Sequence, residues 1–369
     1  MNHIVIDARI INSSTGTYVE RLLHYLQEID SINRYSVLVH SKDRDFWKPT
    51  ASNFSVKIAD FDNYSWNEQT GFKKLLDDMS PDLVHFCMPQ QPIFYKGVHV
   101  TTFHDLTLLK TYSSDKNWFT FHFKQLVGRF VFKKVAKKSK YIITPSQFTK
   151  KELMKFAKIP SDKIAVTPEA ADVFIDKLTP YIHPFSEFIL YVGQQGNHKN
   201  IRRLGDAHQK LLEKHPNLGL ILVGKISGNT VNNKLYFEKK GYQNIHFTDF
   251  LPGDQRDWLY ANTRAYVFPS LMEGFGLPGL EAMGYGAPVV SSKATCLPEV
   301  YGDAAHYFDP FSADDIARAI NDVLTDDNLR KYLIEKGKNQ IAKYSWRRTA
   351  KQTYHVYMDA LNNKSKPRN

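Results

Sequence analysis

Short apolar runs alternate with helix-like stretches from one end of the chain to the other. In the first half the runs predict strands near residues 3–6, 35–39, 83–86, 98–103 and 141–144. The second half restarts the pattern, with strands expected near 188–193, 218–224, 265–269 and 288–291 and amphipathic helices such as 201–214 and 314–324. This alternation is typical of parallel sheets that helices cover on both faces. The sequence therefore predicts an α/β chain with two Rossmann-like units.

The length of 369 residues also suits two domains. The stretch 172–187 contains Pro180 and Pro184 and shows neither a helical nor a strand period, so we place the interdomain linker there. Ser345 is an N-cap candidate for a final helix that runs to about residue 361. We accordingly expect an N-terminal domain, a C-terminal domain, and a closing helix with a polar tail that returns to the N-terminal domain: residues 1–175, 176–345 and 346–369.

The composition indicates what kind of protein this is and in which compartment it works. The hydrophobic fraction of 42% and charged fraction of 24% are those of a globular protein and not of a disordered one. We find no apolar run of about 18 residues, and the first residues lack the zones of a secretion signal, so we expect a cytoplasmic protein. Cys87 and Cys296 lie far apart and match no metal-ligand spacing, which argues against a structural zinc site.

Most of the net charge of +11 comes from one block. Between Lys116 and Lys151 there are ten Lys or Arg and no Asp or Glu, whereas a nucleic-acid-binding protein would more often spread bases around a groove. The block contains an apolar stripe at helical spacing, followed by lysines: Phe119, Phe123, Leu126 and Phe130, then Lys133, Lys134, Lys137 and Lys138. Two interpretations stay open. In the first, the stripe is the core face of a helix, and the lysines complement the negative end of the helix dipole. In the second, the stripe and lysines dock on the anionic inner face of a membrane.

The segment from residue 269 to residue 281 combines a strand end, a glycine-rich turn and a helix start. Gly274 and Gly276 let a backbone approach a ligand closely, and a proline follows in the first helical turn, where free N–H groups attract anions. Glu273 is expected in the loop, and Glu281 in the first turns of the helix. The alternative is a purely structural turn, followed by a carboxylate that stabilises the N-terminus of a helix. It explains each residue by itself but not their combination. The whole string favours a diphosphate site.

This segment resembles the Glu-x7-Glu signature of the retaining glycosyltransferases of family 4, whose GT-B fold pairs two Rossmann-like domains across a deep cleft. Further stretches resemble elements of the family in the same order: residues 14–18, 103–106, 144–148, 191–193, 198–200 and 344–346. The resemblance covers almost the entire chain. It implies a donor site in the C-terminal domain and acceptor binding mainly in the N-terminal domain.

The resemblance also implies roles for the residues of the segment. Glu273 would face the donor sugar, and Glu281 would accept hydrogen bonds from ribose hydroxyls, because a carboxylate offers only acceptors. Backbone N–H groups would contact sugar and phosphate at four positions: Gly274, Phe275, Gly276 and Leu277. The two carboxylates would then bind two parts of one donor and would not form the carboxylate pair of a glycoside hydrolase.

Lys199 matches the lysine with which the family neutralises the diphosphate leaving group. Many members carry an arginine five residues before this lysine and another directly before it, where this chain has Gln194 and His198. Either backbone amides hold the diphosphate, or a second base such as Lys225 helps. Leu251 is a positional candidate for a contact with the nucleobase.

In the first half, His104 follows an expected strand, and the resemblance implies that it meets the donor sugar and supports catalysis together with Glu273 and Lys199. A buried, satisfied histidine is the alternative. Asp105 would support the site, orient His104 or cap the next segment. Gly16 precedes a helix, so its backbone would meet the donor phosphate, with a plain turn glycine as the alternative.

The function implied is a retaining hexosyltransferase of the mannosyltransferase-like group. It would move a sugar, with GDP-mannose as the best match, to a glycan or lipid-linked acceptor in cell-surface polysaccharide synthesis, without a metal or other cofactor. Two other classes stay open: a GT-B synthase with a small soluble sugar acceptor, and a non-catalytic binding protein of the same fold.

Overall fold

The computed structural model describes residues 1–110, 118–174 and 177–362, and the side chains of residues 110–124 lie outside the description. The chain divides into two compact units. Among the described residues, unit 1 comprises 1–110, 118–169 and 345–362, and unit 2 comprises 170–174 and 177–344. The division falls between Glu169 and Ala170, a few residues before the expected boundary at 175 and 176, which itself lies outside the described residues.

Unit 1 is built on one seven-stranded parallel sheet in the order β3-β2-β1-β4-β5-β6-β7. Its strands are β1 (His3–Asp7), β2 (Arg34–Val39), β3 (Phe54–Ile58), β4 (Leu83–Phe86), β5 (His99–Thr102), β6 (Tyr141–Thr144) and β7 (Ile164–Val166). The central strands are buried on both faces, which explains why they read as continuous apolar runs.

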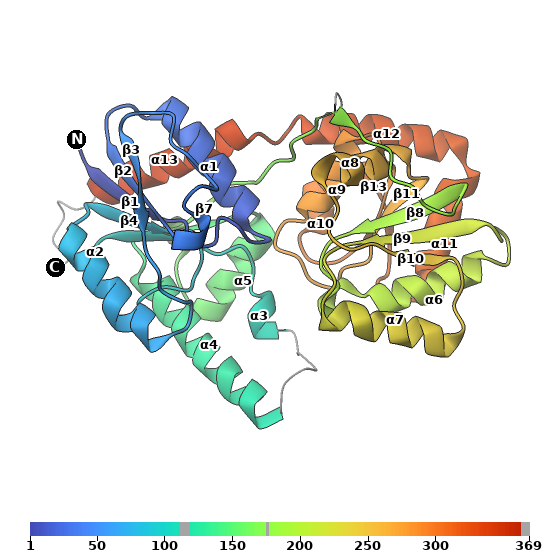
Figure 1. Cartoon of the computed structure of the whole chain (residues 1–369), viewed down its shortest axis with the longest axis horizontal. Helices are drawn as coiled ribbons and strands as arrows, with labels where there is room; N and C mark the ends of the chain where they lie inside the picture. Colours follow the sequence, from blue (N-terminus) through green and yellow to red (C-terminus); the bar gives the residue numbers. More distant parts are fainter. Residues whose placement is uncertain (111–117, 175–176, 363–369) are drawn as a thin grey trace. The chain divides into compact units, whose positions relative to one another are not determined.

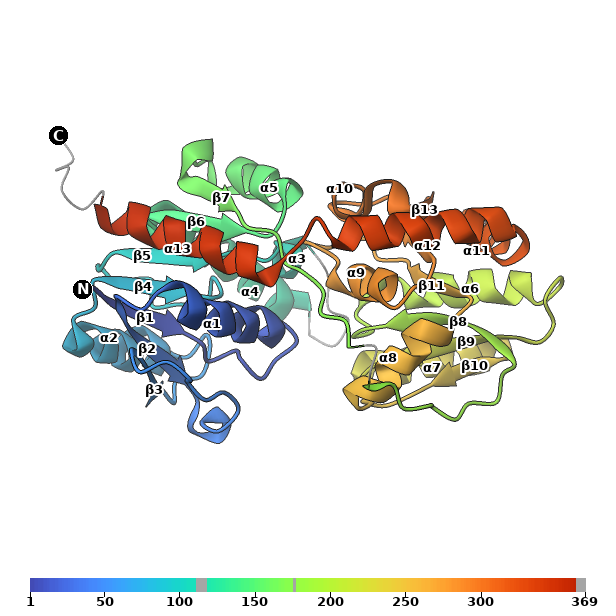
Figure 2. The same cartoon turned by 90° about the horizontal axis from the view of Figure 1, so that it is seen from above.

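Helices cover both faces of this sheet, with α1 and α13 on one face and α2 and α4 on the other (Figure 1). They are α1 (Gly16–Ile29), η1 (Ser41–Asp43), the π-helix η2 (Glu68–Phe72), α2 (Lys73–Met79), α3 (Thr107–Lys110), α4 (Trp118–Lys138), α5 (Gln147–Ala157), η3 (Ser161–Lys163) and α13 (Trp346–Asn362). Helix α13 packs against α1 (Figure 2). The closing helix therefore belongs to the N-terminal unit, as predicted.

Unit 2 repeats the plan with a six-stranded parallel sheet in the order β10-β9-β8-β11-β12-β13. Its strands are β8 (Glu187–Val192), β9 (Leu218–Val223), β10 (Ile245–Phe247), β11 (Ala265–Phe268), β12 (Val289–Ser292) and β13 (Ala305–Phe308). Its helices are η5 (Asn197–Lys199), α6 (Ile201–Leu211), α7 (Gly228–Lys240), α8 (Gly253–Asn262), α9 (Leu277–Gly284), α10 (Leu297–Tyr301), η6 (Gly302–Ala304), α11 (Ala313–Thr325) and α12 (Asp327–Ile341). Two parallel α/β units confirm the predicted fold class.

The strand order identifies where each unit can bind a ligand. In unit 1 the order reverses between β1 and β4, and in unit 2 it reverses between β8 and β11. Open α/β sheets bind ligands beyond the carboxyl ends of the strands at such a switch point, because the following loops diverge to opposite faces there. We therefore expect the functional residues in the loops that follow these four strands.

Candidate functional site

The loops after β8 and β11 meet at the switch point of unit 2. The N–H of Leu271 donates to the carbonyl of His198 at 2.7 Å. The side chain of Asn200, a residue in the left-handed region with φ of 60°, donates to the carbonyl of Pro269 at 3.1 Å. These bonds fix residues 269–271, the start of the segment 269–281, against the loop that carries Lys199.

Two residues that the sequence assigned to the donor site form an ion pair. Lys199 Nζ lies 2.6 Å from Glu273 Oε1, and the two side chains are 17% and 12% exposed. Lys199 is the last residue of η5, and the backbone N–H of Glu273 donates to Thr295 Oγ1 at 3.2 Å. The fold thus brings together a lysine and a carboxylate that are 74 positions apart in the sequence.

Glu281 has different partners. It lies in α9, and the hydroxyl of Tyr260 donates to its Oε2 at 3.2 Å. Burial raises the pKa of the Glu281 carboxyl, although the positive charge of Arg256 and the Tyr260 hydrogen bond oppose that rise. Glu273 and Glu281 therefore have separate surroundings, one with a lysine and the other with a tyrosine and an arginine.

The turn between the two glutamates requires glycine at Gly276. This residue caps α9 with φ of +95°, and a Cβ there would lie 2.6 Å from Leu297 Cδ2 and from Tyr301 Oη. The Tyr301 hydroxyl also donates to the carbonyl of Gly276. Both the backbone conformation and the lack of space exclude a side chain. Three other residues were predicted to contact the donor through their backbone N–H groups. Of these, Gly274 and Phe275 are buried, and Leu277 is half-buried.

A cavity of about 410 Å³ lies at the carboxyl ends of β8 and β9. It is lined by residues 194–199, 225–227 and Asn229. The lining brings Lys199 and Lys225 together with Gln194, and it contains no Asp or Glu among the residues that the structure describes. A lining with two lysines and no carboxylate suits an anionic ligand such as a diphosphate, although Lys199 is also paired with Glu273 from outside the lining.

Gln195 in the same lining was not singled out from the sequence. It is buried, and among the described residues its Nε2 has no hydrogen-bond partner. A buried N–H donor without a partner costs free energy that a ligand oxygen would recover. The flanking Gly193 and Gly196, which mark a tight turn, were the available signal in the sequence. Leu251 does not line the cavity; it is half-buried after β10, and its contact with a nucleobase stays a prediction.

In unit 1, His104 has a partner at each ring nitrogen. Its Nδ1 lies 3.1 Å from Glu169 Oε1, and its Nε2 lies 3.1 Å from the carbonyl oxygen of Cys87. Both partners are acceptors, which favours an imidazolium with two N–H groups. Burial lowers the pKa of His104, but the hydrogen bond and charge of Glu169, with a contribution from Asp105, raise it overall. His104 is therefore biased towards its cationic form.

Asp105 and Glu169 differ in what they do for this histidine. Asp105 Oδ1 accepts the N–H of Thr107 at 2.8 Å at the start of α3, so the structure supports its capping alternative. Glu169, which the sequence did not indicate, is the group that bonds the imidazole. It follows a short strand at the sheet edge, where no periodic pattern points to a site.

Gly16 begins α1 in a closely packed turn. A Cβ at this position would lie 1.8 Å from the carbonyl oxygen of Ile11, and its N–H donates to the carbonyl of Ser13 at 2.9 Å. These contacts support the turn-glycine alternative. A contact between Gly16 and a donor phosphate stays a prediction.

Helix α4 does not bury the described end of the predicted apolar stripe. Leu126 and Phe130 are 68% and 60% exposed, whereas the side chains of Phe119 and Phe123 lie outside the description. The residues of α4 that reach the core are Phe132, Val135 and Ala136. The core-face interpretation is therefore wrong for Leu126 and Phe130.

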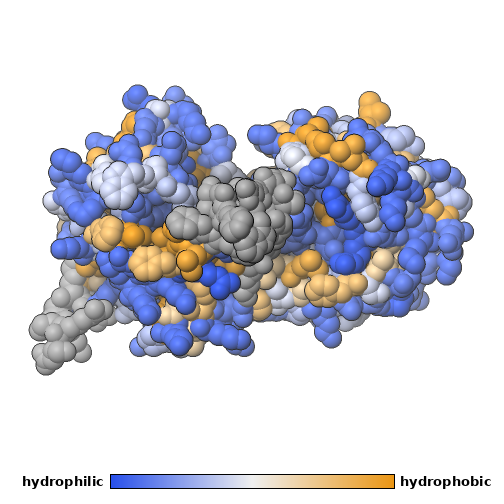
Figure 3. Space-filling model, turned by 90° about the horizontal axis from the view of Figure 1, so that it is seen from below, coloured by the Kyte–Doolittle hydropathy of each residue, from blue (hydrophilic) through white to orange (hydrophobic). Residues whose placement is uncertain are grey.

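Lysines and aromatic rings alternate beside these exposed residues. Lys134 Nζ lies 4.2 Å from the ring centroid of the exposed Phe94, and Lys133 Nζ lies 5.3 Å from that of Phe156. In the view from below, hydrophobic and hydrophilic side chains adjoin on the face that carries α4 (Figure 3). We call the following set the basic-aromatic patch: Phe94, Leu126, Phe130, Lys133, Lys134, Lys137 and Lys138.

The described residues contain no group of three or more His, Cys, Asp or Glu side chains that could hold a metal ion. The sequence has two Asp-x-Asp triplets, at residues 43–45 and 60–62, and neither belongs to such a group. Within the described part of the chain, no helix has the length and apolarity needed to cross a bilayer.

Two family models match the chain. Residues 15–173 match Glycosyltransferase Family 4, and residues 183–340 match Glycosyl transferases group 1. The chain is 33% identical over 273 residues to the O-antigen chain mannosyltransferase B of Escherichia coli, a match that covers 70% of this chain and 69% of that protein. It is 31% identical over 381 residues to a serotype-specific mannosyltransferase WbdA of Escherichia coli, covering 93% of this chain but only 45% of that protein.

Solved structures resemble the whole chain. A sucrose-phosphate synthase from Thermosynechococcus elongatus superimposes with a TM-score of 0.79 at 17% identity, covering 99% of this chain and 100% of that one. WaaG, a glycosyltransferase involved in lipopolysaccharide biosynthesis, gives a TM-score of 0.73 at 16% identity, covering 96% and 99%. At identities this low, the superpositions establish the fold alone. They confirm the predicted pair of Rossmann-like domains.

Proposed function

We propose, from the premise that this chain belongs to glycosyltransferase family 4 and has the GT-B fold, that it is a retaining mannosyltransferase that uses GDP-mannose. The family matches and relatives support a nucleotide-sugar-dependent glycosyltransferase of polysaccharide synthesis. Mannose is supported by the names of the relatives O-antigen chain mannosyltransferase B and WbdA. The proposed acceptor is a glycan or lipid-linked glycan.

The cavity of unit 2 carries this proposal. As the bond between sugar and diphosphate breaks, negative charge accumulates on the leaving diphosphate. Lys199 and Lys225 line the cavity and would stabilise that charge, and Gln195 Nε2 would donate to a phosphate oxygen. Because these residues supply the compensation, we propose that the reaction needs no metal cofactor.

Glu273 fits a binding role better than a nucleophilic one. Its carboxylate is paired with Lys199 at 2.6 Å, which lowers its readiness to attack an anomeric carbon. Carboxylate oxygens accept hydrogen bonds from sugar hydroxyls. We place the acceptor hydroxyl on the same face of the sugar as the leaving group. The new C–O bond then forms as the old one breaks, and the hydroxyl proton passes to the departing diphosphate, with retention of configuration.

Thermal-shift measurements with GDP, UDP and ADP and their sugars test the donor. A ligand at about 100 times its Kd stabilises the folded protein by about 2.7 kcal/mol. GDP and GDP-mannose should raise the Tm, and Lys199→Ala should remove most of that rise, whereas the exposed Lys214→Ala should not. Selective stabilisation by UDP would contradict the assignment of GDP-mannose as donor. An unchanged Tm with every nucleotide and nucleotide sugar would contradict the proposed transferase function. The anomeric configuration of the product, read by NMR, tests retention.

The basic-aromatic patch is the proposed membrane surface of the enzyme, at the inner face of the membrane. Exposed Leu126 and Phe130 would insert between lipids, and each lysine near an anionic surface adds about 1 kcal/mol. The affinity for vesicles of anionic phospholipid, measured by sedimentation, should fall more than about tenfold when the four lysines of the patch become Gln. The control replaces four exposed lysines of unit 2: Lys214, Lys234, Lys239 and Lys240. Equal loss, or no loss, in the two variants would refute the surface.

A further inference from the structure

The loop between β3 and η2 of unit 1 exposes two aromatic residues close together in sequence. Tyr64 is 62% exposed and Trp66 is 78% exposed. Tyr64 also has φ of +64°, a left-handed conformation that a bulky residue rarely adopts. Such backbone persists only where the surroundings hold it, and it is concentrated at ligand sites.

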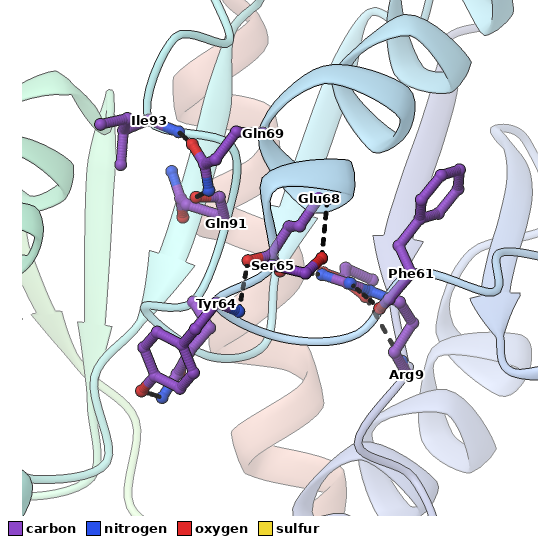
Figure 4. A network of polar contacts seen from close by, with 10 residues as sticks. Arg9, Phe61, Tyr64, Ser65, Glu68, Gln69, Gln91 and Ile93 are labelled. Atoms are coloured by element: carbon purple, nitrogen blue, oxygen red, sulfur yellow. Dashed lines mark hydrogen bonds and ion pairs between the residues drawn. The ribbon is translucent and has the colours of Figure 1, made fainter.

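A buried ion pair holds this loop in place. Glu68 Oε2 accepts the backbone N–H of Tyr64 at 2.9 Å, and Glu68 Oε1 lies 2.9 Å from Arg9 Nη2 (Figure 4). Arg9 Nη1 donates to the carbonyl of Phe61 at 2.7 Å. The side chains of Arg9 and Glu68 are each 1% exposed. The loop is therefore fixed near its beginning and at its end.

The same network connects the loop to the switch point of the sheet. Asp7, the last residue of β1, accepts from Arg9 Nε and Nη2, both at 2.8 Å. Asp7 and Glu68 supply two carboxylates to the one guanidinium of Arg9, so this buried group presents no free positive charge to an anionic ligand. What the loop presents outward is aromatic.

Gln90 follows β4, the strand on the other side of the switch point. It is 5% exposed, and its Nε2 donates to the hydroxyl of Tyr64. Among the described residues, nothing donates to its Oε1, which is buried. A buried amide oxygen without a donor is destabilising, and a ligand hydroxyl would satisfy it.

We propose that Tyr64, Trp66 and Gln90 form a subsite for a sugar ring of the glycan acceptor. A sugar ring has an apolar C–H face, which packs on aromatic rings, and a rim of hydroxyl groups, which donate to an amide oxygen. A neutral ligand of this kind needs no charged partner, and Asp7 and Glu68 already engage the guanidinium of Arg9. Arg9 and Glu68 act as positioning residues. The subsite rests on the proposed function, because it identifies the acceptor of that transferase as an oligosaccharide.

Variants at the exposed Trp66 test the subsite with little risk to folding. The probe is an α-linked mannotetraose, assayed as acceptor with GDP-mannose and, separately, as a free ligand by saturation-transfer NMR. Trp66→Ala should raise the acceptor KM about tenfold or more and leave the donor KM unchanged, and Trp66→Phe should restore most of the affinity. Tyr332→Ala, which removes a 46% exposed aromatic ring from α12, should change neither constant.

The outcomes separate this inference from the proposed function. An unchanged acceptor KM in Trp66→Ala overturns the subsite. If the wild-type enzyme hydrolyses GDP-mannose but neither binds nor elongates the oligosaccharide, the subsite is wrong and the donor chemistry stands. If no nucleotide sugar is bound or hydrolysed, the proposed function fails, and NMR binding of mannotetraose, lost in Trp66→Ala or retained, still decides the subsite.

Discussion

Lys199 Nζ lies 2.6 Å from Glu273 Oε1 and joins the loops that follow β8 and β11. Both side chains are mostly shielded from water, so each charge depends on the other for compensation. Lys199 also lines the cavity that suits a diphosphate. A bound diphosphate would offer this lysine a second anion and leave more of the Glu273 carboxylate for hydroxyl groups of the sugar.

Lys199→Met should lower kcat by about 10² to 10³, because it removes a charge whose effect grows as the leaving group departs. Steady-state kinetics with saturating donor measures this effect. Lys214→Met, at an exposed lysine of the same unit, is the matched control. A kcat within about threefold of the wild type for Lys199→Met would remove this lysine from the catalytic machinery.

Gly276→Ala should destabilise the protein by about 1 to 3 kcal/mol or more, since it adds a contact at 2.6 Å to an unfavourable backbone conformation. Gly286→Ala provides the comparison. Gly286 has φ of +80°, but no atom lies within 4 Å of an added Cβ, so only the backbone strain applies. The Tm of the two variants measures the difference. If the Tm falls by the same amount in both variants, the contacts with Leu297 and Tyr301 are not the reason why residue 276 must be glycine.

The strands that the sequence failed to predict lie at the four sheet edges. They are β3, β7, β10 and β13. Central strands such as β4 are buried at every position, so each reads as an apolar run, whereas the edge strand β10 is only half-buried throughout. An edge strand has one neighbour and a more accessible face, which interrupts the apolar pattern on which the prediction depended.

The candidate sites show a similar division. Lys199 could be predicted because it matches a lysine of the family resemblance, and Lys225 because it closely follows the end of a predicted strand. Glu169 could not, since an acid in a loop has no distinctive spacing and only the fold brings it to His104. For Gln195 the flanking glycines indicate a turn, but only the fold shows that this turn lines the cavity. The exposure of Phe130 could not be predicted either, because helical spacing predicts an apolar stripe but not whether another part of the protein packs against it.

His104 should titrate above its ordinary pKa of 6.5, mainly because Glu169 offsets the effect of burial. Since the folded-state pKa is the raised one, this group stabilises the fold fully below about pH 6.5, and the contribution is lost as the pH rises through the folded-state pKa. NMR titration of the imidazole measures the pKa directly. Glu169→Gln should lower it, whereas Glu213→Gln, at an exposed acid of unit 2, should not. An unchanged titration in Glu169→Gln would show that other groups hold the proton.

Removal of Glu68 should be destabilising because its side chain is 1% exposed, so water has little access to replace it as the acceptor for the Arg9 guanidinium and the Tyr64 N–H. Glu68→Ala leaves Arg9 paired with Asp7 but removes the acceptor of the Tyr64 N–H and one acceptor of Arg9, and each buried donor left unsatisfied should cost about 1 to 3 kcal/mol. Asp78→Ala breaks an ion pair with Lys74 in which the side chains are 60% and 75% exposed, and it should cost less than about 1 kcal/mol. Urea unfolding of both variants gives the comparison.

Glu68→Gln separates stability from positioning, because it keeps most of the shape and a hydrogen-bonding oxygen while removing the charge. It should fold, with a smaller loss of stability than Glu68→Ala, and show a raised acceptor KM if the loop carrying Tyr64 and Trp66 loosens. A normal acceptor KM in a variant whose loop has become mobile by NMR would mean that the rigidity of this loop serves the fold and not the acceptor.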